Sequence, residues 1–258
     1  MSTDNVRVER DAAATTITLT RPGKRNALSS AMMTDLTDAL REAGASDTLA
    51  VVLAAEGPVF SAGHSFEDLA GADLRAARAL FRQCTELMDT VQGIAQPVVA
   101  RVHALATAAG CQLVATCDLA VAADTAGFAL PGGKGGMFCH TPLVALSRNV
   151  GRKRAMEMAL SGDVVDAATA ADWGLVNRVV PAADLDAAVA DLVARVTRGS
   201  AYGRTAGKRT FYAQAGLPQR QAYELAVEVM AAVALGEDAQ EGFRAFLDKR
   251  PAVYRSRP

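Results

Sequence analysis

Short apolar runs alternate with longer stretches of helical periodicity through the first three quarters of the chain. Residues 15–19 alternate polar and apolar side chains, which is typical of a half-buried strand. Residues 49–54 and 98–102 are short, mainly apolar runs rich in valine, as expected for strands covered on both faces. Further strands are expected at residues 119–122 and 177–180. The pattern predicts an α/β core.

Amphipathic helices are expected between these strands. Residues 30–42 show helical spacing, and a second helix carries a stripe at i, i+3 and i+4 formed by Leu80, Phe81, Cys84, Leu87, Met88 and Val91. Residues 152–160 and 167–173 predict two more helices, and Gly174 is placed to cap the latter.

Strand signals stop after about residue 195. Residues 202–216, 219–235 and 238–249 predict successive helices separated by glycine and proline. We therefore expect an α/β core over residues 1–195 and a helical region over 196–258. Residues 222–235 are apolar around much of the helix, so this helix should pack on the core or on another subunit.

Composition narrows the function classes. The chain has 258 residues, is 50% hydrophobic and carries a net charge of −1, with no basic face for nucleic acid. It has no apolar run long enough to span a membrane, and residues 1–11 lack an apolar signal region, so we expect a cytosolic protein without nucleic-acid or membrane partners. Four isolated cysteines are expected to be free thiols. Three distant histidines show no metal-ligand spacing, so no metal site is expected.

Two turns of small residues stand out because each follows a strand. Residues 58–69 read PVFSAGHSFEDL, and residues 104–113 read ALATAAGCQL. Such turns let a backbone N–H approach a ligand closely, and a helix beginning there would favour negative charge at its N-terminus. Taken singly, each also fits an ordinary turn or the close packing of a helix on a sheet.

Together the two turns resemble the oxyanion-hole segments of the crotonase (enoyl-CoA hydratase) family, written roughly FSAGADL and GxxxGGGCEL. Flanking matches extend this resemblance: LTRPGKRNAL at residues 19–28, CDLAVAAD at 117–124, the block at 155–181 and EGFRAFLDKR at 241–250. The matches run in order along nearly the whole chain. The sequence is identified as a member of this family, and especially of its enoyl-CoA hydratase domain-containing branch.

The resemblance implies a crotonase (ClpP-like) fold, which is a spiral of ββα units followed by a C-terminal helical trimerisation region. It implies a homotrimer or a dimer of trimers, with an acyl-CoA thioester as the partner. Coenzyme A would arrive as part of the substrate, and no permanently bound cofactor is expected.

The resemblance also assigns site residues. The backbone N–H groups of His64 and Ala109 would hold the thioester oxyanion, without use of the His64 side chain. Coenzyme A would lie along Lys24, Arg25, Ala27, Ala62, Ser65 and Phe66, with Phe246 and Lys249 reaching it from a neighbouring subunit. For Lys24, Arg25 and Lys249 the alternative is a solvated surface charge.

Two positions depart from the family pattern for hydration. Gln112 stands where hydratases carry their first catalytic glutamate, and Gly132 stands at the second. An amide positions water but takes no proton, and loss of one acid–base group typically costs about 10²–10⁴-fold in rate. Restoring both glutamates is expected to raise hydration.

The run from Gly132 to Pro142 contains other reactive side chains. His140 lies where some family members carry a catalytic aspartate, and Cys139 is a nucleophile only if its pKa is lowered. The alternatives are a loop histidine bonded to backbone and a buried thiol. His103, before the second turn, is interpreted as a structural hydrogen-bonding residue.

Three functions follow from these features. The first is an acyl-CoA-processing protein of the crotonase family, nominally an enoyl-CoA hydratase of fatty-acid metabolism. The second is a non-catalytic acyl-CoA binder or regulator that retains the pocket. The third is another reaction of the family, isomerisation or thioester hydrolysis, that uses His140 or Cys139.

Overall fold

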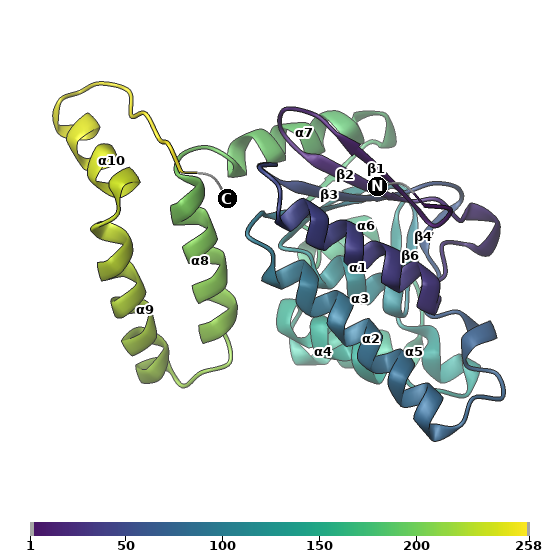
Figure 1. Ribbon diagram of the computed structural model, residues 1–258. Coiled ribbons are helices and arrows are strands. Elements are labelled where there is room, and N and C mark those ends of the chain that lie inside the picture. The colour runs from purple at the N-terminus through teal and green to yellow at the C-terminus, as the bar shows by residue number, and fades with distance from the viewer. Residues whose placement is uncertain (1–2, 257–258) are drawn as a thin grey trace.

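The computed structural model describes residues 3–256 and contains two β-sheets with helices around them (Figure 1). The larger sheet has the strand order β1-β2-β3-β5-β7-β10, and the smaller has the order β4-β6-β8-β9. Only the β1–β2 and β8–β9 pairs are antiparallel. The strands are β1 (Val6–Arg10), β2 (Thr15–Leu19), β3 (Val51–Ala55), β4 (Val59–Ser61), β5 (Val98–Val102), β6 (Leu105–Thr107), β7 (Leu119–Ala123), β8 (Gly127–Ala129), β9 (Val165–Asp166) and β10 (Arg178–Val180).

Three successive units each place one strand in the larger sheet, the next strand in the smaller sheet, and then a helix. The units are β3-β4-α2, β5-β6-α3 and β7-β8-α4. This repeat confirms the predicted spiral of ββα units. The helices are α1 (Ser30–Gly44), α2 (Leu74–Gly93), α3 (Ala109–Thr116), α4 (His140–Asn149), α5 (Arg152–Ser161), α6 (Ala167–Asp172), α7 (Leu185–Val196), α8 (Ala201–Gln214), α9 (Gln219–Ala234) and α10 (Glu237–Leu247).

The larger sheet is covered on both faces, as the apolar runs at residues 49–54 and 98–102 predict. Val51 and Leu53 of β3 face a core shared with α1 and α2, whereas Ala50 and Val52 face a second core under α7. Figure 1 shows α7 on one side of this sheet and α1 and α2 on the other. The alternation of side chains along β3 therefore supplies both hydrophobic layers.

Most predicted elements lie within a few residues of the observed ones. Gly174 has φ +87° and follows the C-cap residue Trp173 of α6, which confirms it as the glycine that ends this helix. The sequence interpretation did not include the strands β1, β6, β8 and β9 or the helices α4 and α7. For α7 the signal was present, because Leu185, Val189, Leu192 and Val193 are all buried at helical spacing.

The helices α8, α9 and α10 form an arm that stands beside the α/β core (Figure 1). The expectation that the helix at 222–235 packs on the core is not met within one chain. No residue of α9 is buried, and its helix contacts are with α8 and α10. The arm therefore leaves much of its apolar surface exposed.

A single polar cluster attaches α8 to the core. The Lys208 ammonium is 2.7 Å from the Asp118 carboxylate, which also accepts hydrogen bonds from the Tyr212 hydroxyl and the Val98 N–H at 2.7 Å each. Lys208 also donates to two backbone carbonyls, those of Val91 and Gln96. Burial lowers the pKa of Lys208, and Asp118 opposes that shift. The pair is therefore largely removed from solvent yet fully hydrogen-bonded.

We expect Asp118→Ala to lower the free energy of unfolding by about 3–5 kcal/mol, because it leaves a buried ammonium, a hydroxyl and an N–H without their acceptor. Chemical denaturation measures this loss. The matched control is Glu67→Ala, which removes the exposed partner of Lys24 and should cost less than about 1 kcal/mol. Equal losses in the two variants would contradict the role of Asp118 in a buried, stabilising cluster.

Candidate functional site

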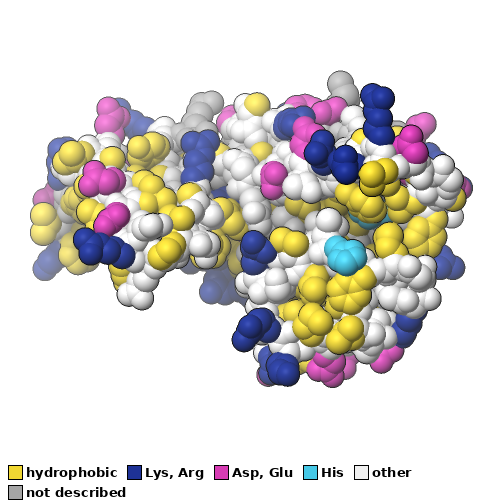
Figure 2. All heavy atoms as spheres, turned by 90° about the horizontal axis from the view of Figure 1, so that it is seen from below, with side chains coloured by type: hydrophobic (Ala, Val, Ile, Leu, Met, Phe, Trp, Pro, Cys, Tyr) yellow, Lys and Arg dark blue, Asp and Glu magenta, His cyan; other side chains and the backbone are white. Residues whose placement is uncertain are grey.

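An apolar cavity of about 250 Å³ lies where the two small-residue turns meet the loop before α4. Figure 2 shows hydrophobic side chains around a histidine on the core. The cavity brings together five predicted site residues from three distant segments. Its lining consists of Ala62, His64, Phe66, Phe81, Ala108, Ala109, Pro131, Gly132, Gly135, Met137, Phe138, Cys139, His140, Thr141 and Pro142.

The first turn is held by its backbone. Gly63 has φ +85°, a conformation that favours glycine, and its carbonyl accepts a hydrogen bond from the Leu28 N–H at 2.7 Å. Only a three-residue 3-10 helix, Phe66–Asp68, follows, and α2 begins at Leu74. The predicted helix N-terminus is therefore absent at His64, because the chain turns again before a helix forms.

The second turn opens directly into α3. Ala108 has φ 48° and ψ −120°, a backbone conformation that is strained for any residue with a β-carbon. Its N–H donates to the Ala129 carbonyl at 2.9 Å, which holds the turn beside β8. Ala109 is the first residue of α3, so its N–H points out of the helix N-terminus, where the dipole favours negative charge.

Glycines allow the two turns to touch. A β-carbon at Gly63 would lie 2.8 Å from Cβ of Ala108 and 3.0 Å from the Ala109 nitrogen. A β-carbon at Gly110 would collide with the Ser61 carbonyl oxygen. Segments 45 residues apart are thus in direct backbone contact, as the combined motifs predict.

Two backbone donors remain unpaired at this contact. Within residues 3–256, neither the His64 N–H nor the Ala109 N–H donates a hydrogen bond to the protein. Both residues line the cavity. Free N–H groups at an apolar cavity can bind a carbonyl oxygen that gains negative charge.

The loop preceding α1 is fastened to the first turn by Asn26, a residue that the site prediction missed. Asn26 is fully buried and has φ 49°, and its amide donates to the carbonyls of Glu56 and Val59. Its own carbonyl accepts from the Ser61 hydroxyl at 2.8 Å. The NAL motif carried this signal, since asparagine tolerates positive φ better than most residues.

The residues expected to bind coenzyme A fall into two groups. Lys24, Arg25 and Ala27 lie beside Ala62, whose N–H donates to the Arg25 carbonyl at 3.0 Å. Lys24 is exposed and paired with Glu67, Ser65 is buried, and Phe66 is exposed beside the cavity. The second group consists of Phe246, in the last turn of α10, and Lys249, just after that helix (Figure 1). Neither residue lines the cavity of its own chain.

The two positions that replace glutamates differ in their surroundings. Gln112 is buried in α3 beside Cys84, with its Oε1 4.0 Å from the Cys84 Sγ, and it does not line the cavity. Gly132 does line it, but a β-carbon there would lie 2.7 Å from both the Cys139 sulfur and the Met137 carbonyl oxygen. A glutamate restored at position 132 therefore does not fit, which corrects the expectation that restoring both residues raises hydration.

Cys139 and His140 have different environments. Burial raises the pKa of Cys139, and the Gly132 N–H, 3.3 Å from its sulfur, only partly opposes this. The nucleophile interpretation of Cys139 is therefore wrong near neutral pH, because the thiol stays protonated. His140 is an exposed first residue of α4, its ring centroid 5.3 Å from that of Phe138.

Charged groups are missing from the cavity wall. Its lining includes no aspartate, glutamate, lysine or arginine. No cluster of three metal-ligating side chains occurs in the described part of the chain. None of the helices within residues 3–256 is long and apolar enough to cross a membrane.

Fold and cavity define a protein of the crotonase type, and the chain belongs to the enoyl-CoA hydratase/isomerase family, whose model matches residues 9–257. It is 43% identical over 240 residues to the mitochondrial enoyl-CoA hydratase domain-containing protein 3 of Mus musculus, covering 92% of this chain and 80% of that protein. An enoyl-CoA hydratase crystal structure from Mycobacterium smegmatis has a TM-score of 0.94 at 43% identity, covering 98% of this chain and 99% of that one. The human domain-containing protein 3 has a TM-score of 0.93 at 38% identity, covering 96% and 99%.

These relatives correct the expected location. The proteins of mouse, rat, human, Xenopus laevis and Danio rerio, 40–43% identical to this chain, are all named mitochondrial, which contradicts a cytosolic protein. The expectation of a cytosolic protein was based on the lack of an apolar secretory signal, but mitochondrial targeting segments are amphipathic and basic instead. Composition therefore does not decide the compartment.

We expect Gly132→Ala to lower the free energy of unfolding by about 1–3 kcal/mol, because the new methyl group overlaps the Cys139 sulfur and the Met137 carbonyl. Gly135→Ala is the matched control: it lines the same cavity, yet a β-carbon there meets nothing within 4 Å. Thermal denaturation compares the two. A stable Gly132→Ala protein would show that the loop does not hold this close contact.

Proposed function

We propose that this protein binds acyl thioesters of coenzyme A with the thioester oxygen between the N–H groups of His64 and Ala109. The observation that carries this proposal is the pair of unpaired donors at one apolar cavity. The acyl chain extends between Phe81 and Phe138, and the coenzyme A moiety runs from the cavity along the loop at residues 24–27. Coenzyme A comes and goes with the substrate and is not a resident cofactor.

The surroundings of the donors support oxyanion binding. A preorganised donor in a dry site is typically worth about 3–4 kcal/mol to an enolate-like oxyanion. Ala109 adds the dipole of α3, and no carboxylate in the cavity lining opposes the developing charge. The strained Ala108 backbone aims the second donor, which is a typical use of strain at functional sites.

The positions of the two family glutamates offer no acid–base group for proton transfer. We therefore propose that hydration of 2-enoyl thioesters is slow. Gln112 is turned toward Cys84, and Gly132 has no room for a side chain. A non-catalytic acyl-CoA binder is the limiting case, in which the cavity holds the thioester without turnover.

The second candidate is a different reaction of the family, isomerisation or thioester hydrolysis, with His140 as the acid or base. One observation favours it: His140 lines the same cavity and is exposed, so both a ligand and water can reach its ring. Turnover lost in His140→Ala with binding retained would separate this candidate from the binder.

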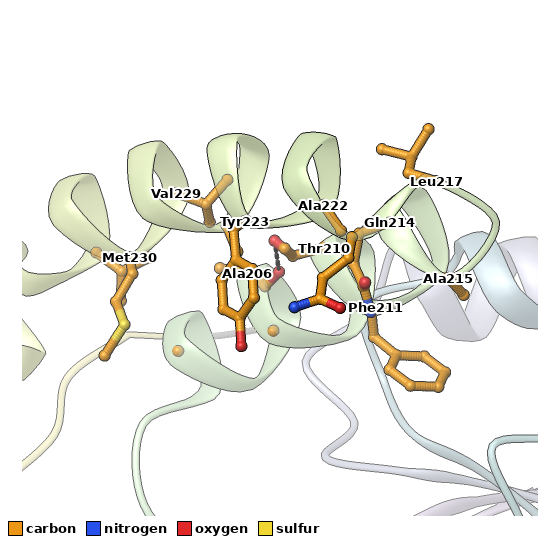
Figure 3. A pocket seen from close by; sticks show the side chains of 15 residues that line it. Ala206, Thr210, Phe211, Gln214, Ala215, Leu217, Ala222, Tyr223, Val229 and Met230 are labelled. Carbon is orange, nitrogen blue, oxygen red and sulfur yellow. Dashed lines mark hydrogen bonds between the residues drawn. The ribbon is translucent and has the colours of Figure 1, made fainter.

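The arm is proposed to join copies of the chain into a trimer or a dimer of trimers. An open groove of about 740 Å³ runs between α8 and α9. Figure 3 shows Met230, Tyr223 and Val229 of α9 along it, facing Ala206 and Thr210 of α8. Met230 is 77% exposed and Phe246 83% exposed, which suits burial against another subunit. In such an assembly Phe246 and Lys249 would reach the coenzyme A of a neighbour.

We expect Ala109→Pro to weaken binding of crotonyl-CoA at least about fivefold, because proline removes one donor and its ring also crowds the strained Ala108 and the close contact with Gly63. The bound enoyl thioester should also lose the red shift that a polarised carbonyl gives its absorption. Calorimetry and difference spectroscopy measure the two effects.

The control is Ala167→Pro, the same change at the first position of α6, away from the cavity. It should leave affinity and spectrum as in the parent protein. If Ala109→Pro still binds and shifts crotonyl-CoA fully, the proposed oxyanion site is wrong.

Met230→Asp should break the assembly into monomers, because it places a charge in the buried contact. Light scattering after size-exclusion chromatography reports the mass. Gln221→Asp, on the exposed polar side of α9, is the control and should keep the parent mass. A monomeric parent protein would refute the proposed trimer.

A further inference from the structure

The side chain of His64 has no assigned task in oxyanion binding, yet it lies in the cavity wall. Both of its ring nitrogens are sealed from solvent, and neither has a hydrogen-bond partner of normal geometry in the described chain. A buried polar atom without a partner typically costs about 1–3 kcal/mol. Such an atom beside a ligand cavity indicates a partner supplied by the ligand.

The other two histidines differ. His103 donates one hydrogen bond from its Nε2 to the Gly57 carbonyl at 2.8 Å, although its Nδ1 is unpaired. His140 is exposed at the cavity mouth. Among the described histidines, His64 alone has both nitrogens buried and unpaired at the cavity.

His64 is uncharged near neutral pH. Burial lowers its pKa, and the Leu28 backbone and the Asp68 carboxylate only partly oppose this. The neutral ring has one donor and one acceptor nitrogen. Its edge-to-face contact with Phe81, 5.3 Å between centroids at 75°, fixes the plane of the ring.

The ring can offer its nitrogens without leaving this position. Both nitrogens are sealed, so neither faces the cavity in the present orientation of the ring. A half-turn about the Cβ–Cγ bond exchanges the edges of an imidazole and keeps its outline almost unchanged. A ligand that supplies a hydrogen bond therefore favours the turned ring.

The matching ligand group is neutral and both donates and accepts. No charged side chain lines the cavity to neutralise a second carboxylate on the acyl chain, so a charged substituent is disfavoured. A hydroxyl group complements a neutral imidazole in either tautomer. Since the N–H of the same residue holds the thioester oxygen in the proposed function, the hydroxyl must lie within the first few carbons.

We propose that the His64 imidazole is a specificity-determining group that hydrogen-bonds a hydroxyl near the thioester of a hydroxyacyl-CoA. This rests on the proposed function, because it requires the thioester to occupy the cavity. It assigns the side chain a role separate from that of its backbone N–H.

The test compares 3-hydroxybutanoyl-CoA with butanoyl-CoA by calorimetry. The parent protein should bind the hydroxy compound about five- to tenfold more tightly, the value of one hydrogen bond. His64→Phe keeps a ring against Phe81 and should bring this ratio to about one, whereas His64→Gln should restore part of it. His103→Phe removes an imidazole elsewhere and should leave the ratio unchanged.

A second measurement needs no variant. The ¹⁵N resonances of the His64 ring should shift when 3-hydroxybutanoyl-CoA binds and much less with butanoyl-CoA. Equal affinities in the parent protein, a preference that persists in His64→Phe, or unchanged ring resonances would each overturn the inference. If neither compound binds, it is the proposed function that fails.

Discussion

Two backbone turns meet so closely in this protein that glycine is required on both sides of the contact. Gly63 faces Ala108 and the Ala109 nitrogen, and Gly110 faces the Ser61 carbonyl. This contact sets the position of α3 against the smaller sheet and leaves two N–H groups without partners. The cavity, the strained Ala108 and the fastening of the Lys24–Ala27 loop by Asn26 all depend on the same approach of the chain.

The cavity combines a strong electrostatic element with weak means of moving protons. Its donors are backbone groups, which stay in place whatever side chains surround them. Acid–base groups, in contrast, must be side chains. Here Gln112 faces Cys84, and the close contact of Gly132 with Cys139 leaves no room for a side chain at position 132. A chain can in this way keep the binding of a thioester carbonyl while its chemistry changes. The neutral His64 ring adds a polar group of a different kind, suited to a substituent of the ligand rather than to its carbonyl.

A buried cluster of polar and charged side chains joins the arm to the core, whereas the apolar surface of the arm is exposed. Asp118, Lys208 and Tyr212 form a buried cluster that fixes α8, whereas α9 and α10 have few contacts with the α/β core. The apolar surface of α9 is therefore available to another copy, which is the arrangement proposed for the assembly. In the proposed assembly, Phe246 and Lys249 at the far end of the arm would contribute to the coenzyme A site of another copy.

Periodicity and motifs determined the α/β core, the terminal helices and the two turns, because these are local patterns of side-chain size and polarity, whereas the repeated ββα units were expected only from the family resemblance. The helix α7 was also encoded, in Leu185, Val189, Leu192 and Val193, but was not distinguished from its alanine-rich surroundings. Tertiary structure alone decided the rest. It showed that no helix begins at His64, that Gly132 cannot carry a side chain, that burial raises the pKa of Cys139, and that both nitrogens of His64 are unpaired. Each of these depends on the distance to an atom remote in the sequence, and a linear pattern contains no such distance.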